Sequence, residues 1–101
     1  MNYDNVLSLL GIAQRGRRLV SGQDVVKREI TRGRVALMII AEDTSFNSKD
    51  KFVSLSKKHG IPVLIWGNSY DLGRALGQNK RTAIGITDKN FAVEISKRLK
   101  F

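Results

Sequence analysis

The chain has 101 residues without cysteine, and its 18 Lys and Arg residues outnumber 9 Asp and Glu residues, for a formal net charge of +9. This length fits one domain over residues 1–101, while the lack of cysteine and the single histidine exclude disulfides and disfavour metal sites. A basic charge of this size in one compact domain is typical of nucleic-acid binding, with an anionic membrane or an acidic protein as alternatives.

The first predicted helix spans residues 4–14, where apolar side chains recur at helical spacing. Arg15, Arg17 and Arg18 follow it around a glycine, where the backbone can turn. Each arginine taken alone fits a solvated loop, but the three together, beside the start of another helix, favour a phosphate contact surface. Leu19-Val20 could form a very short strand.

The second predicted helix opens at Ser21-Gly22-Gln23-Asp24 and stops at Gly33. Ser21 and Asp24 have the spacing of a capping box. The N-terminus of a helix can also receive an anion, although an ordinary capped helix is the simpler interpretation. The arginines just before this helix, and Lys27 and Arg28 on its exposed side, favour a functional edge.

The run Val35 to Ala41 is apolar throughout and rich in β-branched residues. Such a run predicts a central strand covered on both faces, with a buried helix segment as the alternative. Glu42 and Asp43 follow it, at the end of a strand where open α/β sheets often carry their functional groups.

Five further elements are predicted after this strand: a helix over 46–59, a strand over 63–66, a short helix over 70–76, a strand over 82–87 and a helix over 89–99 that Asp88 caps. In the first of these helices Phe52, Val53 and Leu55 should face the core, with Phe46 as a further candidate. Strands that alternate with helices predict an α/β fold, with helices on both faces of a small parallel or mixed sheet of three or four strands.

Catalytic constellations are missing from the sequence. The one histidine has no matching nucleophile, and no phosphate-binding loop or dinucleotide fingerprint is present. Glu42 and Asp43 are neighbours on a strand and should point to opposite faces, so they make a poor acid–base pair. We therefore expect neither an enzyme nor a cofactor, and no small-molecule substrate.

Four segments carry a resemblance to a known family: Val20–Asp24, Arg32–Asp43, Gly60–Val63 and Asp71–Gly77. Together they resemble the kink-turn RNA-binding ribosomal protein superfamily of archaeal and eukaryotic large-subunit type, and within it the small bacterial YlxQ-type branch. The likeness runs from about Leu7 to Leu99. It implies a three-layer α/β/α sandwich with a small mixed four-stranded sheet.

The resemblance also implies an RNA site, formed by the N-terminus of the second helix and by the loop before the last strand. An Asn-Glu-x-x-Lys pattern of the family falls on Asp24, Val25 and Arg28. Val25 offers no acceptor to a guanine edge and Asp24 lacks an amide donor, and each missing base contact costs about 1–3 kcal/mol. Binding driven by charge is therefore expected to survive more readily than kink-turn readout.

The resulting hypothesis is a cytoplasmic, monomeric protein that binds structured RNA, with ribosomal RNA as the expected target. The ribosome is a further candidate partner, and a membrane is not expected. The N-terminus Met1-Asn2-Tyr3-Asp4 has neither the basic nor the apolar region of a signal peptide. The expected RNA-binding residues are Arg15, Arg17, Arg18, Gly22, Gln23, Asp24, Lys27, Arg28, Glu42, Asp43, Gln78, Asn79, Lys80, Arg81 and Thr82. The alternatives are a protein-interaction module that kept the fold and lost RNA readout, and an enzyme that holds a phosphorylated ligand at a helix N-terminus.

Overall fold

The computed structural model describes residues 2–99, and no helix within them is long and apolar enough to cross a membrane. Helices and strands alternate along the chain, as the sequence predicts. The elements are α1 (Asn2–Arg15), β1 (Leu19–Ser21), α2 (Gln23–Thr31), β2 (Leu37–Ile40), α3 (Phe46–Lys58), β3 (Val63–Ile65), α4 (Ser69–Ala75), β4 (Ala83–Ile86) and α5 (Lys89–Leu99).

The four strands form one mixed sheet in the order β1-β4-β2-β3. β4 is antiparallel to both β1 and β2, whereas β2 and β3 are parallel. β2 lies between two partners and is buried throughout, so the expectation of a central strand is confirmed. The strand is shorter than the apolar run that predicted it.

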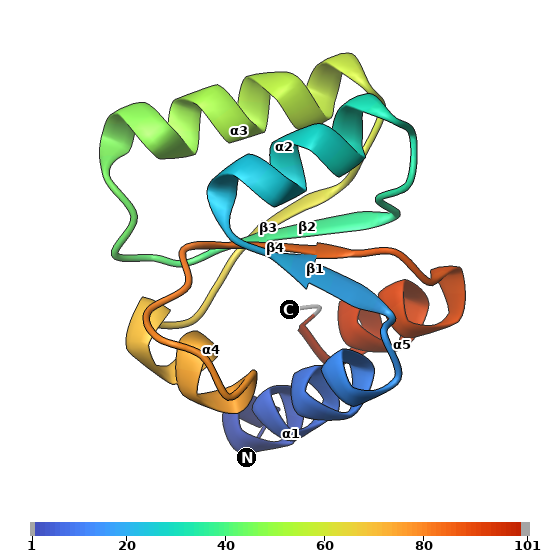
Figure 1. Ribbon diagram of the computed structural model, residues 1–101, viewed down its shortest axis with the longest axis vertical. Coiled ribbons are helices and arrows are strands. Elements are labelled where there is room, and N and C mark those ends of the chain that lie inside the picture. The colour runs from blue at the N-terminus through green and yellow to red at the C-terminus, as the bar shows by residue number, and fades with distance from the viewer. Residues whose placement is uncertain (1, 100–101) are drawn as a thin grey trace.

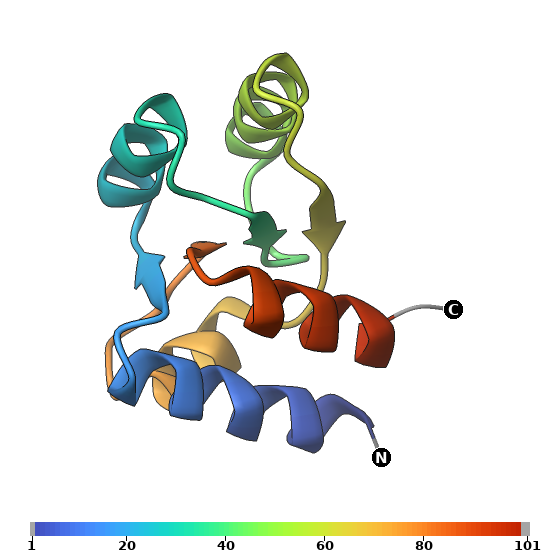
Figure 2. The ribbon, with the colours of Figure 1, turned by 90° about the vertical axis from the view of Figure 1, so that its right-hand side faces the viewer.

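Helices cover both faces of the sheet (Figure 1). α2 and α3 lie on one face, and α1, α4 and α5 lie on the other, as the view turned by 90° also shows (Figure 2). Each face has its own cluster of buried apolar side chains. The three-layer α/β/α sandwich that the resemblance implies is therefore confirmed.

The apolar run of β2 is explained by these two clusters. Leu37 and Ile39 belong to the cluster under α1, α4 and α5, whereas Met38 and Ile40 belong to the cluster under α2 and α3. Successive side chains of a strand point to opposite faces. A strand that is covered on both faces therefore has no polar side to show.

The predicted capping box at Ser21 is wrong. Ser21 is the last residue of β1 and pairs with Ile84 of β4, while Gly22 takes the N-cap position of α2 with a φ of 97° and no side-chain cap. The backbone N–H of Gly22 also donates to the carbonyl of Ala83 at 3.0 Å. Pairing with β4 therefore holds Ser21 in the sheet, away from the position of a cap.

Two apolar residues of α3 do not face the core. Phe46 is 80% exposed and Val53 is 36% exposed, whereas Phe52 is 2% exposed. The buried stripe of this helix runs through Phe52 and Ser56, which lie four positions apart and therefore share a face. Phe46 is the first residue of the helix, and Ser45 caps it by accepting a hydrogen bond from the backbone of Ser48.

Candidate nucleic-acid interface

Two opposite ends of the sheet carry the expected site residues (Figure 1). We call one end the α4 edge, made of residues 22–24, 42–43, 68–70 and 78–82. We call the other the α5 edge, made of residues 16–18, 33–36 and 87–89. The register of β1 on β4 fixes this division, because Ser21 pairs with Ile84 at the α4 edge and Leu19 pairs with Ile86 toward the α5 edge.

At the α4 edge, the start of α2 is joined directly to the loop before β4. The side-chain amide of Gln23 donates to the hydroxyl of Thr82 at 2.9 Å. The Nε of Arg81 donates to the hydroxyl of Ser21 at 3.0 Å, just before the helix. The two segments that the resemblance singles out therefore form one continuous surface, although about sixty residues separate them in sequence.

The loop over residues 78–82 is held tightly against α4. A Cβ atom at Gly73 would lie 1.9 Å from the carbonyl oxygen of Asn79, so only glycine permits this approach. The backbone N–H of Gln78 donates to the carbonyl of Gly73 at 2.8 Å, and that of Arg81 donates to the carbonyl of Ser69 at 3.0 Å. These contacts fix the shape of the loop before any ligand arrives.

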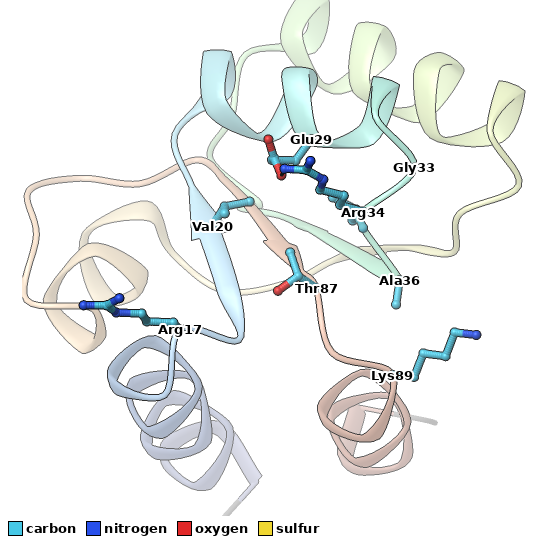
Figure 3. A pocket seen from close by; sticks show the side chains of 9 residues that line it. Arg17, Val20, Glu29, Gly33, Arg34, Ala36, Thr87 and Lys89 are labelled. Carbon is cyan, nitrogen blue, oxygen red and sulfur yellow. Dashed lines mark hydrogen bonds and ion pairs between the residues drawn. The ribbon is translucent and has the colours of Figure 1, made fainter.

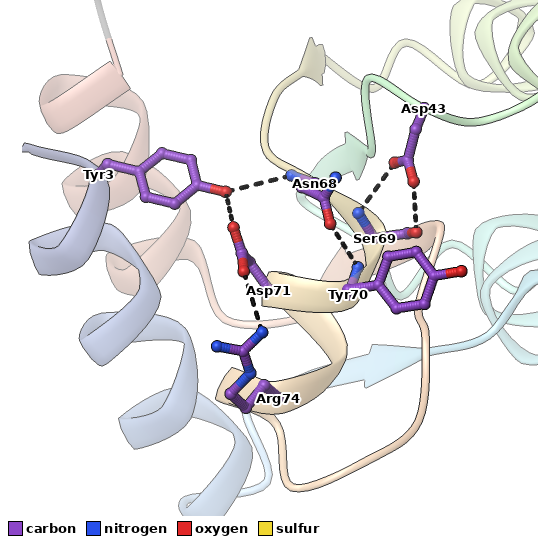
Figure 4. A network of polar contacts seen from close by, with 7 residues as sticks. All are labelled: Tyr3, Asp43, Asn68, Ser69, Tyr70, Asp71 and Arg74. Atoms are coloured by element: carbon purple, nitrogen blue, oxygen red, sulfur yellow. Dashed lines mark hydrogen bonds and ion pairs between the residues drawn. The ribbon is translucent and has the colours of Figure 1, made fainter.

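Asp43 anchors the start of α4 at the same edge (Figure 4). Its two carboxylate oxygens accept from the backbone N–H of Ser69 at 2.9 Å and from the hydroxyl of Ser69 at 2.6 Å. Both hydrogen bonds favour the charged carboxylate and lower the pKa of Asp43. Asp43 thus positions α4, while its neighbour Glu42 is exposed to solvent.

The other half of this polar network ties α1 to α4 (Figure 4). The hydroxyl of Tyr3 donates to Asp71 at 2.6 Å and accepts from the backbone N–H of Asn68 at 3.3 Å. Burial, followed by the hydrogen bond to Asp71, raises the pKa of Tyr3. The side chain of Asn68 caps α4 by accepting from the N–H of Tyr70 at 2.9 Å.

One aromatic residue of the α4 edge is absent from the expected site. Tyr70 is 61% exposed, and the Nζ of Lys80 lies 5.5 Å from the centre of its ring. A cation at this distance over a ring is attracted to it. The sequence shows only that Tyr70 begins a short helix, and no local pattern connects it with a lysine ten positions later.

The arginines after α1 lie at the α5 edge and not beside the N-terminus of α2. Arg18 forms an ion pair with Asp88, and its carbonyl accepts from the N–H of Thr87 at 2.9 Å. The pKa of Asp88 is lowered, first by a hydrogen bond from the N–H of Phe91 and then by Arg18. β1 separates Arg18 from Gly22 by roughly 13 Å, at about 3.3 Å per residue.

Charges of both signs meet at the α4 edge. Asp24 and Glu42 are exposed there, and Asp43 binds Ser69, whereas the cations of the neighbouring loop are Lys80 and Arg81. Lys27 and Arg28 are exposed further along α2, where they line a groove of about 330 Å³ with Asp24. Most of the positive charge among residues 2–99 therefore lies outside the α4 edge.

Comparison with known proteins identifies relatives over most of the chain. A protein of Bacillus subtilis (strain 168) named "RNA-binding protein YlxQ" is 36% identical over 84 residues, which cover 83% of this chain and 84% of that protein. A protein of the same name from Enterococcus faecium is 25% identical over 91 residues, which cover 90% of this chain and 87% of that protein.

Solved structures support the same relationship. A protein of unknown function from Bacillus halodurans superposes with a TM-score of 0.91 at 34% identity, over 95% of this chain and 97% of that chain. The 15.5kD RNA binding protein of Giardia lamblia superposes with a TM-score of 0.80 at 21% identity, over 93% of this chain and 83% of that chain. At this identity the likeness shows only that the two proteins share a fold.

The sequence model of the ribosomal protein L7Ae/L30e/S12e/Gadd45 family matches residues 4–96. Its description and the names of the two sequence relatives are those of ribosomal and RNA-binding proteins rather than of enzymes, which agrees with the expectation of a non-enzymatic protein. The match spans every strand and all but the last residues of α5. The chain therefore belongs to the ribosomal protein L7Ae/L30e/S12e/Gadd45 family.

Proposed function

We propose that this chain is a cytoplasmic, monomeric RNA-binding protein that grips structured RNA through its α4 edge, with ribosomal RNA as the target. The observation that carries the proposal is the junction of α2 with the loop before β4, through the bonds from Gln23 to Thr82 and from Arg81 to Ser21. Family membership and the names of the YlxQ relatives support it.

The start of α2 has the properties of a phosphate-binding element. The first N–H groups of a helix lack intrahelical partners and carry a partial positive charge. No side chain caps this end, and a Cβ at Gly22 would meet nothing within 4 Å. An RNA backbone can therefore approach the helix closely, with Lys27 and Arg28 one turn further along.

Base readout at this surface is proposed to be weak. Val25 is partly buried and has no polar group, and Asp24 presents an exposed carboxylate without a donor. A residue that cannot pair with a base edge forgoes about 1–3 kcal/mol of discrimination. Affinity should therefore come mainly from phosphate contacts and from the shape of the RNA.

A salt-titrated binding assay tests this proposal. It compares a kink-turn RNA, the same RNA with its G·A pairs replaced, and a plain duplex. We expect steeply salt-dependent binding to all three RNAs, with less than about a tenfold preference for intact G·A pairs, since phosphate contacts supply the affinity.

The outcomes separate the parts of the proposal. Tight binding that requires the G·A pairs would overturn the claim of weak readout and would mean that Asp24 and Arg28 suffice for it. No binding to any of the three RNAs at moderate salt would overturn the proposed function. That result would favour a protein-interaction module that kept the fold.

A further inference from the structure

The α5 edge contains a groove that the proposed function does not use (Figure 3). It has a volume of about 510 Å³, and its lining includes the cationic side chains of Arg17, Arg34 and Lys89 together with the apolar Val20 and Val35. The three cations come from the turn after α1, from the loop before β2 and from the start of α5. Elements far apart in sequence thus place three cationic residues around one groove, with the side chains of Arg17 and Lys89 pointing away from each other (Figure 3).

The acidic groups at this edge are already neutralised. Glu29 lies in the groove lining and is 8% exposed, and guanidinium nitrogens of Arg28, Arg32 and Arg34 lie 3.6, 3.5 and 3.4 Å from its carboxylate. One carboxylate is therefore shared by three arginines. Asp88 is likewise engaged by Arg18.

Two cations of the groove have no partner of opposite charge. Among residues 2–99, neither Arg17 nor Lys89 forms an ion pair. Their side chains extend on opposite sides of the groove, with Arg34 on a third side next to Glu29 (Figure 3). The groove therefore has an excess of positive charge that the protein itself leaves unbalanced.

The backbone of Arg17 is also unusual. It is the only residue other than glycine with a positive φ among those described, at 58°. This left-handed conformation is unfavourable for an L-residue, and such strain tends to persist at functional sites. The hydrogen bonds from the N–H of Arg17 to Gln14 and from the N–H of Arg18 to Ala13 hold the turn.

We propose that the α5 edge is a second RNA contact surface, at which Arg17, Arg34 and Lys89 bind the phosphate backbone of the RNA that the α4 edge grips. This inference rests on the proposed function. Separate cations around an open groove match phosphates spaced along a strand better than they match one small anion. The exposed side chains of Lys27 and Arg28 on α2, and of Arg32 at its C-cap, provide a basic path between the two edges.

The test uses two triple variants that each remove three positive charges. R17N/R34Q/K89Q alters the groove, where asparagine tolerates a positive φ and glutamine at position 34 keeps a donor near Glu29. K51Q/K57Q/K58Q alters exposed lysines of α3, none of which lines the groove or belongs to the residue ranges of the two edges. Each variant is titrated with salt against a structured RNA, and its thermal unfolding is measured to confirm folding.

We expect the groove variant to bind RNA at least about tenfold more weakly at moderate salt and to reduce the salt slope by about 2–3, since each lost phosphate contact removes nearly one unit. The α3 variant should stay within about twofold of the parent affinity, because its lysines contact no RNA in this proposal. Combining the groove variant with K80A should give additive losses in binding free energy, because the two edges are separate.

Three results would overturn the inference while leaving the proposed function intact. The folded groove variant could bind RNA as well as the parent, or the α3 variant could lose as much affinity as the groove variant. Alternatively, inorganic phosphate alone could stabilise the parent but not the groove variant, which would indicate a site for a small anion. Failure of the parent to bind RNA would overturn the proposed function as well.

Discussion

At the scale of single residues, Gly73 connects the helix α4 with the shape of the candidate interface. Its missing side chain lets the carbonyl of Asn79 approach to where a Cβ would be 1.9 Å away. The loop that carries Lys80 and Arg81 consequently packs directly against α4. A side chain of any size at position 73 must push this loop outward.

We expect G73A to lower the free energy of unfolding by about 1–3 kcal/mol, because overpacking of a tight contact costs that much. G16A is the matched control, since a Cβ there would lie at an ordinary 3.5 Å from its nearest neighbours. Urea unfolding of both variants measures the difference. An unchanged midpoint for G73A would show that the loop yields freely and is not held in place.

At the scale of elements, Arg81 organises the loop over residues 78–82 more than it offers charge to a ligand. Its side chain donates to Ser21 at 3.0 Å, to Gln78 at 3.1 Å and to the carbonyl of Lys80 at 3.4 Å. The side chain of Lys80, in contrast, forms no hydrogen bond or ion pair among the described residues and lies 5.5 Å from the centre of the Tyr70 ring. The two neighbours should therefore fail in different ways when they are replaced.

We expect K80A to weaken RNA binding and to reduce the salt slope by about 1, as the loss of one phosphate contact does. R81A should also speed amide hydrogen exchange in the loop, because three hydrogen bonds are lost, whereas K80A should leave exchange unchanged. R81K should resemble R81A, since lysine cannot reproduce the planar fork of arginine. Full retention of binding and exchange rates in R81K would contradict a positioning role.

The succession of helices and strands could be predicted from local patterns. Apolar periodicity, and caps such as Asp88, depend only on residues a few positions apart in the sequence. The end of β1 could not be, because Ser21 is held in the sheet by β4, more than sixty positions later. Distance also explains the pairing of Tyr70 with Lys80, which no local signal predicts.

The residues that the sequence analysis assigned to one RNA site lie at two separate ends of the sheet in the structure. The start of α2 and the loop before β4 do meet, as the family resemblance implies. The arginines after α1 are near α2 in sequence. In the structure, however, β1 lies between them and places the arginines and the start of α2 at opposite ends of the sheet. Adjacency in sequence therefore did not predict at which end of the sheet these arginines lie.

At the scale of the whole molecule, the two apolar clusters share one sheet. β2 sends Leu37 and Ile39 into one cluster and Met38 and Ile40 into the other. If either helical layer unfolded alone, it would expose a buried apolar face of the strands that the other layer also covers. This arrangement supports the prediction that residues 1–101 form a single domain.

We therefore expect one cooperative unfolding transition, the behaviour of most single domains of this size. Trp66, whose ring lies 4.9 Å from that of Tyr3, reports by fluorescence on the layer of α1, α4 and α5. Far-UV circular dichroism reports on helices of both layers. Coincident denaturant midpoints are the expected result, whereas an earlier transition of Trp66 would mean that the layers unfold separately.

The outer strands of the sheet, β1 and β3, have three residues each, and Pro62 directly precedes β3. Such short outer strands give another chain few free backbone groups with which to extend the sheet. Folded copies are thereby protected from edge-to-edge aggregation. The run over residues 35–41 has the apolar, uncharged character of an amyloid-forming segment, but it is concealed at the centre of the sheet. The hazard of fibre formation therefore belongs to the unfolded chain, and a change that loosens the sheet promotes it even when the surface is untouched.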